Sequence, residues 1–534
     1  MSRRPAAGGA GRHGDADVIV VGAGFGGLGA ALRLAEEGAR VVLLERVGYP
    51  GGCAATFMRG GTRFEAGATL LGGFGPGQLF RRWIDRHGLD VPVDPLDPVL
   101  ELRAPGLDLP VPADREAFVA RLAALPGVPQ SPLRAFLDRQ RAVADRLWGL
   151  FEDPALLLPL GPGGLAGHLS RLPGTLSLLP LLGRPLGALL ASHGLARCAP
   201  LRTYVDALCQ ITVQCTADEA EAPFALAALD YPFRGAGHVR GGVGTLATAL
   251  AGALGDLGAD VRFHDGVTAL RRERDAWCVV SRRGIVRAPQ VVLNLLPGAV
   301  RALLPEGTRV APRLGRAERA LEDGWGACML YLVVRPPAAG AGAPHHLQIV
   351  QDPAAAPVDG NQVFCSVSGP RDEGRAPAGL RTMTVSTHVS LRRLRDLPAA
   401  DVGGYVDGVQ RRMRAALDAH APEWVEDVVH EMTASPRTFE RFTGRPAGSV
   451  GGVPRRAGLA HYATLSPRPV APGVWMVGDS VFPGQSALAA ALGGVKTAEA
   501  VLRTRRGRGR VASTPAGGAR RVNSGGRRRD PGLN

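Results

Sequence analysis

The clearest pattern of apolar residues lies near the start of the chain. Residues 18–21 (VIVV) form a β-branched run that stops at Gly22. Such a run, bounded by a turn signal, predicts a strand that is buried on both faces. A helical pattern follows over 28–37, and a second apolar run covers 40–44. The pattern predicts a strand–helix–strand unit over 17–46.

Three glycines in G-x-G-x-x-G spacing join the first strand to the helix. Gly22 suits the tight turn, Gly24 lets the backbone approach a pyrophosphate, and Gly27 lets helix and strand pack closely. The helix N-terminus offers free N–H groups and a partial positive charge to phosphates. Glu45, at the end of the second strand, is placed to accept hydrogen bonds from an adenosine ribose. We therefore predict a Rossmann-type dinucleotide site rather than a plain glycine turn.

The rest of the chain mixes helical and strand patterns. Further helices are predicted at 78–89, 131–151, 203–218 and 401–420, and strands at 261–263, 290–294, 328–334, 382–388 and 474–477. Alternation over 266–289 predicts antiparallel strands. The overall prediction is an α/β protein.

Small residues recur where a bound cofactor would need room. Paired glycines at 51–52 and the stretch 67–69 (GAT) favour close backbone approach, although ordinary loops would also explain them. The last strand ends at Gly478 and Asp479, and a helix begins near Ser486. A carboxylate at a strand end beside a helix N-terminus suits a ribityl hydroxyl and an electron-rich ring edge.

Charge and cysteine content narrow the class of protein. Of the net charge of +15, residues 503–534 carry +9, from ten arginines and one aspartate. This Gly/Ser/Pro-rich tail should be disordered, as should the polar leader 1–16, which has no apolar segment of a secretory signal. No basic patch is interleaved with aromatic residues, so we expect no nucleic-acid partner. Seven scattered cysteines without a C-x-x-C pair indicate neither a metal site nor a disulfide framework, which fits a reducing cytosol.

The segment 154–196 is rich in leucine, nearly free of acidic residues, and interrupted by Pro and Gly. The interruptions argue against a spanning helix, and no run of 18 apolar residues occurs in the chain. Short amphipathic pieces could form a lid or lie at a membrane surface. A buried helical subdomain is the alternative.

Several motifs together resemble one family. The fingerprint ending in Glu45, the stretches GGCAATF and GTRFEAGATLLGGFGPG, the segment SPRTFERFTGRPAGSVGG and the C-terminal GDSVFPGQ resemble the FAD-dependent amine-oxidase and phytoene-desaturase superfamily. Within it they look most like carotenoid C-3′,4′ desaturases and carotenoid cis–trans isomerases, and retinol saturases share much of the pattern. The likeness covers about 17–502.

The resemblance implies a cofactor, FAD, and the residues that contact it. The implied adenosine and pyrophosphate contacts are Gly22, Gly24, Phe25, Gly26, Gly27, Glu45 and Arg46, and an adenine contact is implied for Val267. The implied flavin-side loops contain Gly52, Cys53, Gly67, Ala68 and Thr69. The implied ribityl and ring contacts are Gly478, Asp479, Gln485, Ser486 and Ala487. Cys53 departs from the arginine that many superfamily members have after the paired glycines. Ser486 departs from the usual glycine after PGQ.

The implied activity is carotenoid desaturation, in which a hydride leaves for flavin N5 and a proton leaves the adjacent carbon. The protein then supplies orientation, an apolar tunnel and the flavin, so the sequence names no catalytic acid or base. His238, His388 and His461 are better explained as structural histidines. A cis–trans isomerase or a retinol-saturase-like enzyme is the alternative. A flavin amine oxidase is disfavoured because the single lysine, Lys496, lies on the wrong element, and a non-catalytic carotenoid-handling flavoprotein is the remaining hypothesis.

The cofactor motifs lie at both ends and in the middle of the chain. We therefore expect a discontinuous FAD-binding domain built from 17–100, 235–305 and 440–502. A second α+β substrate domain with an antiparallel sheet would come from 101–234 and 306–439. The expected partners are a lipophilic polyene and a membrane surface, with an unidentified electron acceptor and no metal. The expected location is cytoplasmic and peripherally membrane-associated.

Overall fold

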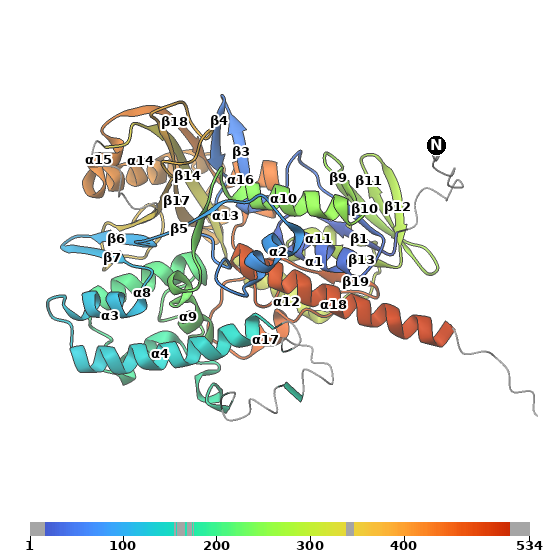
Figure 1. Ribbon diagram of the computed structural model, residues 1–534, viewed down its shortest axis with the longest axis horizontal. Helices are drawn as coiled ribbons and strands as arrows, with labels where there is room; N and C mark the ends of the chain where they lie inside the picture. Colours follow the sequence, from blue (N-terminus) through green and yellow to red (C-terminus); the bar gives the residue numbers. More distant parts are fainter. Residues whose placement is uncertain are drawn as a thin grey trace, which may run out of the picture.

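A computed structural model shows a molecule with two halves (Figure 1). A parallel sheet between helices forms one half, and a larger sheet with a group of helices below it forms the other. The structure describes residues 16–153, 156, 166–167, 174, 176–337 and 346–512.

The first half is built on a five-stranded parallel sheet in the order β19-β13-β1-β2-β9. Its strands are β1 (Val18–Val21), β2 (Val41–Leu44), β9 (Asp260–Arg262), β13 (Gln290–Leu293) and β19 (Val474–Met476). In β1, Val18 lies opposite both Val41 and Gln290, and all four side chains of β1 are buried. Burial on both faces is what the unbroken VIVV run predicts.

Strands from three distant parts of the sequence meet in this sheet. Two come from the segment 17–100, two from 235–305 and one from 440–502. The domain boundaries around them remain our proposal. What the structure shows is the Rossmann-type α/β fold that the sequence predicts.

Two helices from opposite ends of the chain pack tightly beside this sheet (Figure 1). They are α1 (Phe25–Glu36) and α18 (Ala487–Ala512). A Cβ added at Gly29 would come 2.5 Å from the carbonyl oxygen of Ala491, and one at Gly494 would come 2.2 Å from that of Gly26. Glycines therefore let the two backbones approach, which brings the C-terminal motif against the N-terminal fingerprint.

A three-stranded antiparallel sheet extends this half, as the alternation over 266–289 predicts. It consists of β10 (Val267–Arg272), β11 (Trp277–Ser281) and β12 (Gly284–Ala288).

The second half contains a seven-stranded sheet in the order β18-β14-β17-β16-β15-β6-β7. Its strands are β6 (Leu100–Ala104), β7 (Leu107–Val111), β14 (Trp325–Val334), β15 (His346–Val350), β16 (Gln362–Val367), β17 (Arg381–Ser390) and β18 (Val428–Ala434). The prediction of an antiparallel sheet is wrong at one place, because β15 pairs with β6 in parallel. The hairpin of β6 and β7 reaches this sheet from a distant part of the sequence, so its strand direction is not fixed by a tight turn.

Helices and two small strand pairs complete the described structure. The helices are α2 (Leu79–His87), α3 (Arg115–Ala123), α4 (Gln130–Phe151), α7 (Leu186–Ser192), α8 (Ala199–Thr212), α9 (Ala222–Ala228), α10 (Val243–Asp256), α11 (Pro297–Leu303), α12 (Pro312–Glu322), α13 (Leu391–Asp396), α14 (Val402–His420), α15 (Pro422–Val425), α16 (Pro436–Thr443) and α17 (Ala460–Thr464). The strand pairs are β3 (Thr56–Arg59) with β4 (Thr62–Glu65), and β5 (Val93–Pro95) with β8 (Gly237–Val239).

Two predicted boundaries are wrong. The helix predicted over 203–218 ends at Thr212, because Gln214 adopts a positive φ of 61° and its amide donates to the carbonyl of Val450 instead. The tail predicted to be disordered from 503 continues α18 as far as Ala512. Helical geometry there extends from the apolar, buried part of the same helix.

The leucine-rich segment is described only in part. Most of 154–175 lies outside the described residues, and so do 1–15 and 513–534. Within the described remainder, Leu178 and Leu181 are buried in the core, whereas Leu176 and Leu179 are more than half exposed. The segment therefore contributes both to the core and to the surface.

Candidate functional site

One cavity of about 1460 Å³ joins the two halves of the molecule. Every residue that the sequence predicts for cofactor binding lines it, with the exception of Gly27. These lining residues are Gly22, Gly24, Phe25, Gly26, Glu45, Arg46, Gly52, Cys53, Gly67, Ala68, Thr69, Val267, Gly478, Asp479, Gln485, Ser486 and Ala487. Residues up to 465 positions apart in the sequence therefore line the same cavity.

The turn from β1 into α1 forms the first wall of the cavity. Gly22 has a φ of 95°, and Gly24 caps the helix with no side chain bonded to its first N–H groups. The Glu45 carboxylate lies beside this turn and accepts hydrogen bonds from the backbone N–H groups of Ala23 (2.7 Å) and Val47 (3.0 Å). The free helix N-terminus and the oriented carboxylate have the chemistry that a pyrophosphate and a ribose require.

Gly27 acts behind this wall. A Cβ at Gly27 would lie 2.0 Å from the carbonyl oxygen of Gly22, so no larger side chain fits between helix and turn. Its place agrees with the packing role predicted from the glycine spacing, and it does not reach the cavity.

Asn294 is a lining residue that the sequence analysis missed. It follows β13, and its amide lies among three glycines of the site. A Cβ added at Gly24, Gly26 or Gly478 would lie 2.7, 2.8 or 2.7 Å, respectively, from an atom of this amide. A polar residue directly after a buried strand was the available signal, since the carboxyl ends of parallel strands meet at the binding edge. Asn294 thereby fixes how closely the fingerprint and the C-terminal motif approach each other.

The loop that contains 67–69 is tied to the second half by three side chains. The Tyr331 hydroxyl donates to the carbonyl of Ala66 (2.8 Å), and the Tyr231 hydroxyl accepts from the N–H of Gly72 (2.7 Å). The Ser366 hydroxyl donates to Thr69 Oγ1 (2.5 Å). The loop therefore has a defined position at the boundary between the cofactor motifs and the larger sheet.

Asp479 is held in an ion pair that the sequence did not predict. Arg445 contacts its carboxylate at 2.5 Å and also hydrogen-bonds the Cys53 thiol. Burial raises the pKa of Cys53, and Arg445 only partly opposes this. Cys53 is therefore a protonated thiol at neutral pH, consistent with a small loop residue rather than a reactive one.

Side chains at the start of α18 hold the C-terminal motif in place. Gln485 donates to the carbonyl of Val453 (2.8 Å), and Ser486 Oγ accepts the N–H of Ala489 (3.0 Å). The buried Arg455 donates to the carbonyl of Asp479 (3.2 Å). This part of the wall can therefore offer backbone N–H groups to a ligand without rearranging.

Away from the glycines, the cavity becomes apolar and aromatic. Helices α4, α8 and α9 supply Trp148, Phe151, Ile211 and Phe224, and the larger sheet supplies Met329. Such a surface suits an apolar ligand and offers little to a charged one.

The three histidines singled out in the sequence lie in different surroundings. His388 lines the cavity, and burial away from bulk water lowers its pKa to about 4, so it is uncharged at neutral pH. His461 lies on α17 outside the cavity wall. Neither geometry identifies a general base.

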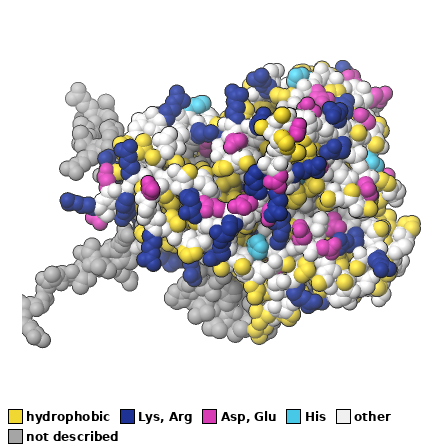
Figure 2. Space-filling view, turned by 180° about the vertical axis from the view of Figure 1, so that it is seen from behind, with side chains coloured by type: hydrophobic (Ala, Val, Ile, Leu, Met, Phe, Trp, Pro, Cys, Tyr) yellow, Lys and Arg dark blue, Asp and Glu magenta, His cyan; other side chains and the backbone are white. Residues whose placement is uncertain are grey.

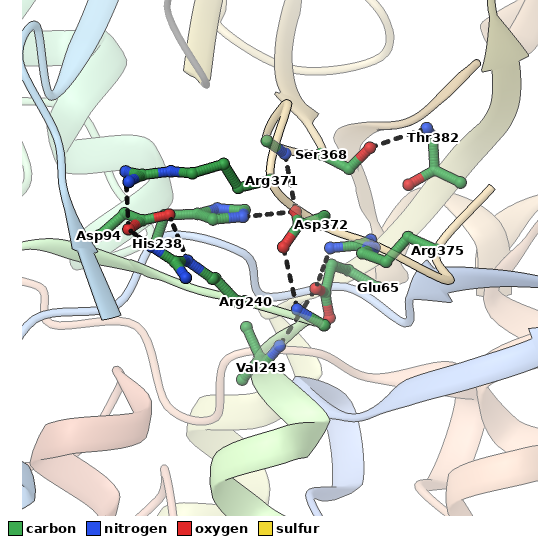
Figure 3. Close-up of polar contacts among 12 residues, drawn as sticks. Glu65, Asp94, His238, Arg240, Val243, Ser368, Arg371, Asp372, Arg375 and Thr382 are labelled. Carbon is green, nitrogen blue, oxygen red and sulfur yellow. Dashed lines mark hydrogen bonds and ion pairs between the residues drawn. The ribbon is translucent and has the colours of Figure 1, made fainter. Parts of the chain in front are cut away.

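His238 belongs to a polar cluster that links the two halves outside the cavity (Figure 3). Its Nε2 lies 2.6 Å from the Asp372 carboxylate, which also accepts the N–H of Gly241 (2.9 Å). In the same cluster, Arg375 pairs with the buried Glu65 at 2.8 Å. The loop after β16 is thereby fastened to the start of α10, which is a structural role.

Other kinds of site are not found within the described residues. They contain no group of three or more His, Cys, Asp or Glu side chains placed to hold a metal ion. No described helix is both long enough and apolar enough to span a bilayer. On the face shown in Figure 2, basic side chains are spread among acidic ones rather than gathered in one patch.

The wall residues fit a flavin dinucleotide. Gly24, Gly26 and Gly478 leave no room for side chains where the fingerprint meets the C-terminal motif, and the helix N-terminus there is uncapped by side chains. Glu45, Arg46 and Asp479 line the same cavity. The donors and the space needed by a dinucleotide are therefore present on one surface.

Comparisons with known proteins agree with this geometry. Residues 20–86 match the model of an NAD(P)-binding Rossmann-like domain. Prolycopene isomerase from Arabidopsis thaliana is 24% identical over 505 residues, covering 91% of this chain and 82% of the relative. Hydroxyneurosporene desaturase from Cereibacter sphaeroides is 28% identical over 520 residues, covering 91% and 97%.

Solved structures share the fold. A double mutant of putrescine oxidase superposes with a TM-score of 0.60 at 17% identity, over 92% of this chain and 99% of that one. Cyclohexylamine oxidase from Brevibacterium oxydans gives 0.58 at 18% identity, over 92% and 100%. These likenesses concern the fold. Over most of its length the chain is similar in sequence to carotenoid isomerases and desaturases, and in fold to flavin amine oxidases.

Proposed function

We propose that this chain is an FAD-dependent carotenoid desaturase. The observation that carries the proposal is the continuity of the cavity, in which the wall around Gly24, Glu45 and Asp479 and the apolar wall around Trp148 and Phe224 bound the same space. A bound flavin would supply hydride acceptance, chemistry that no side chain can perform. The relatives named as desaturases support a polyene as the hydrogen donor.

The protein's own contribution is positioning and exclusion of water. Glu45 and the free N–H groups of α1 would bind the adenosine and pyrophosphate, and Asp479 with Gln485–Ala487 would bind the flavin part. The apolar wall would align a long polyene and keep water from the reacting carbon atoms.

Expression in a carotenoid-producing host tests the proposal. Chromatography of the pigments should show a product with two fewer hydrogens and absorption at longer wavelength than its precursor. Gly26→Ala is the matched inactive variant, because its Cβ would lie 2.8 Å from the backbone of Gly478. Unchanged pigments from a chain that carries its full complement of FAD would contradict the proposal.

Cis–trans isomerisation is the second candidate. It is favoured by prolycopene isomerases that match over 91% of the chain. Isomerisation leaves the substrate's mass unchanged and consumes no electron acceptor. The same chromatography, combined with mass measurement, therefore separates the two activities. A retinol-saturase-like reaction would instead add two hydrogens.

Amine oxidation receives less support from the site. Lys496, the single lysine of the chain, is buried in α18 and does not line the cavity. The cavity therefore lacks the lysine that would be needed beside a flavin in that chemistry. A non-catalytic, carotenoid-handling flavoprotein would bind FAD and polyene without turnover.

We also propose that the protein acts at a membrane surface, with the entrance to the cavity near 154–196. A long polyene resides among acyl chains, and Leu176, Leu179 and Leu459 are each more than half exposed. Gly183 lies against Leu459, the N-cap residue of α17, so Leu459 is beside this segment. Exposed leucines grouped in this way fit insertion into the interface of a bilayer.

Liposome flotation tests this surface. Changing Leu176, Leu179 and Leu459 to Ser should abolish flotation, whereas Leu178 and Leu181 are unsuitable targets because they are buried. Leu257→Ser with Ile285→Ser is the control, since these exposed side chains lie in the Rossmann half. Equal flotation of both variants would place the membrane contact elsewhere.

A further inference from the structure

The two faces of the seven-stranded sheet differ in chemistry. One face carries apolar side chains such as Leu330, Val363 and Val385, which pack against α14. Because successive side chains of a strand alternate, the neighbours Phe364, Ser386 and His388 point to the other face, and these three line the cavity. Polar side chains on this second face can therefore contact the cavity or the residues that line it.

Three polar side chains on this side form a continuous chain of hydrogen bonds. Thr69 lines the cavity, and its Oγ1 accepts from the Ser366 hydroxyl at 2.5 Å. Ser366 Oγ lies 2.7 Å from His346 Nδ1. The pairing of β15 with β16 places His346 directly opposite Ser366, so this second contact is built into the strand register.

The inner members of the chain are shielded from bulk water. His346 is 2% exposed and Ser366 is 8% exposed. The His346 ring stacks on Phe364, with ring centroids 5.7 Å apart and planes 13° from parallel. Since Phe364 itself lines the cavity, the imidazole lies one aromatic ring behind the cavity wall.

The composition of this chain differs from that of the other tethers on the same loop. The contacts of Tyr331 with Ala66 and of Tyr231 with Gly72 end on backbone groups. Thr69, Ser366 and His346 are instead two hydroxyls and an imidazole, each able to accept a proton while releasing another. A tether needs only one hydrogen bond, whereas this arrangement can also move a proton.

His388 is the competing proton acceptor in the cavity. It lines the wall directly, and burial lowers its pKa to about 4. It packs near Trp325, with ring centroids 6.1 Å apart. Thr69, by contrast, is connected through Ser366 to the imidazole of His346, so a proton taken up there can be passed on.

We propose that Thr69, Ser366 and His346 form a proton relay between the cavity and the interior of the sheet. The proposal rests on the proposed function and names the group that accepts the proton lost by the substrate. For this transfer both hydroxyls turn so that Thr69 donates to Ser366 and Ser366 donates to His346 Nδ1, the reverse of the resting hydrogen bond from Ser366 to Thr69. The substrate's C–H proton then passes to Thr69 Oγ as the Thr69 proton passes to Ser366 and the Ser366 proton passes to His346 Nδ1. The hydride and its two electrons leave separately to the flavin, so one C–H bond is broken by each route.

Thr69 is then the catalytic residue, and Ser366 and His346 are positioning residues that act through it. Removal of the first C–H hydrogen as hydride leaves an electron-deficient polyene, whose adjacent C–H bond needs only a weak base. A relay running in the opposite direction would donate a proton to a polyene, which extends its use to the alternative reactions of this family.

The kinetic test compares Thr69→Val, Ser366→Ala and His346→Gln with Thr384→Val. Thr384 lies opposite Ser366 on β17 and is buried, but it has no place in the chain of hydrogen bonds, which makes it the matched control. Ser366→Ala and His346→Gln should bind FAD within about twofold of wild type, and Thr69→Val is measured with saturating FAD because Thr69 lies in a flavin-side loop. They should slow anaerobic flavin reduction by polyene on the order of 10²-fold, as loss of a general base does.

A solvent isotope effect distinguishes proton transfer from a structural defect. Flavin reduction in D₂O should be slower than in H₂O for wild type and for Thr384→Val, and the difference should vanish in Ser366→Ala. A Thr69→Val enzyme that reduces flavin at the wild-type rate would overturn the relay.

A measurement without turnover separates failure of the relay from failure of the proposed function. In ¹⁵N-histidine spectra, the His346 signal is identified by its loss in His346→Gln. Adding a carotenoid to the FAD-loaded chain should shift this signal in wild type and in Thr384→Val, but not in Thr69→Val. Equal shifts in all variants, or none in wild type, would overturn the relay. If wild type never reduces flavin with any polyene, the proposed function fails and this spectrum alone decides the relay.

Discussion

The two walls of the cavity depend on the sequence in different ways. The first part of the cofactor wall is encoded locally: Gly22, Gly24 and Glu45 lie within one strand–helix–strand unit, and their spacing alone predicts their arrangement. The substrate wall combines α4, α8 and α9 with strands of the larger sheet, and no short motif specifies it. Cofactor binding can therefore be inferred from the sequence, whereas the shape of the substrate wall cannot.

The sharpest test of the cofactor wall is Gly27→Ala. Its Cβ would lie 2.0 Å from the carbonyl oxygen of Gly22, so helix α1 must move away from the turn. We expect loss of bound FAD and a lower free energy of unfolding by about 1–3 kcal/mol, the usual effect of overpacking. The measurements are FAD content per chain and the urea midpoint.

Gly252→Ala is the control for this change. It lies inside α10 with no atom within 4 Å of an added Cβ, so the substitution should be neutral or stabilise by up to about 1 kcal/mol. Full FAD content in Gly27→Ala would show that the close packing is not required.

In the substrate wall, the largest expected effect is the pH dependence contributed by His388. Its pKa is about 4 in the folded chain and about 6.5 when unfolded, so the unfolded state binds the proton first as pH falls. Stability should therefore decrease between about pH 6.5 and 4, by up to about 3 kcal/mol. The loss should level off below this range.

The comparison is the urea midpoint of wild type and His388→Phe across the same pH range. The difference between the two should grow as pH falls. Parallel curves would show that the His388 environment is more hydrated than its place in the wall indicates.

Much of the fold follows from the sequence for physical reasons. The VIVV run, which is bounded by glycine, predicts the buried strand that is observed, and the helix begins at Phe25, directly after the last glycine of the turn. Long-range features could not be predicted in this way. The parallel pairing of β15 with β6 and the place of Asn294 among the glycines depend on segments that are distant in sequence. Likewise, Arg445 carries no local signal for its ion pair with Asp479.

Glu45→Ala should weaken FAD binding without unfolding the chain. The carboxylate is already oriented by the N–H groups of Ala23 and Val47, so the variant loses both the orientation and the ribose acceptor. Charged hydrogen bonds contribute roughly 1.5–3 kcal/mol. Titration of the apoprotein with FAD measures the loss, and Glu37→Ala, at the end of α1 away from the cavity, is the control. Unchanged affinity would remove Glu45 from the site.

The smallest expected effect concerns Gly24, a residue of the local strand–helix–strand unit that packs against the distant Asn294. The backbone of Gly24 has an ordinary φ of −71°, and the nearest atom to an added Cβ is the amide nitrogen of Asn294, at 2.7 Å. Gly24→Ala should weaken FAD binding about tenfold, or about 1.4 kcal/mol.

Adding Asn294→Ala should restore part of this loss, giving a favourable coupling in the double-mutant cycle. A double mutant as weak as the sum of the single changes would show that the cofactor itself, rather than Asn294, excludes a side chain at position 24.

We infer that the two walls serve one reaction, and the most direct test is to mix the FAD-loaded chain with a liposome-borne polyene without oxygen and follow the flavin's visible absorbance. The flavin should bleach while one new double bond forms for each flavin reduced. A chain that binds both FAD and polyene, yet neither bleaches nor forms a product, would contradict it.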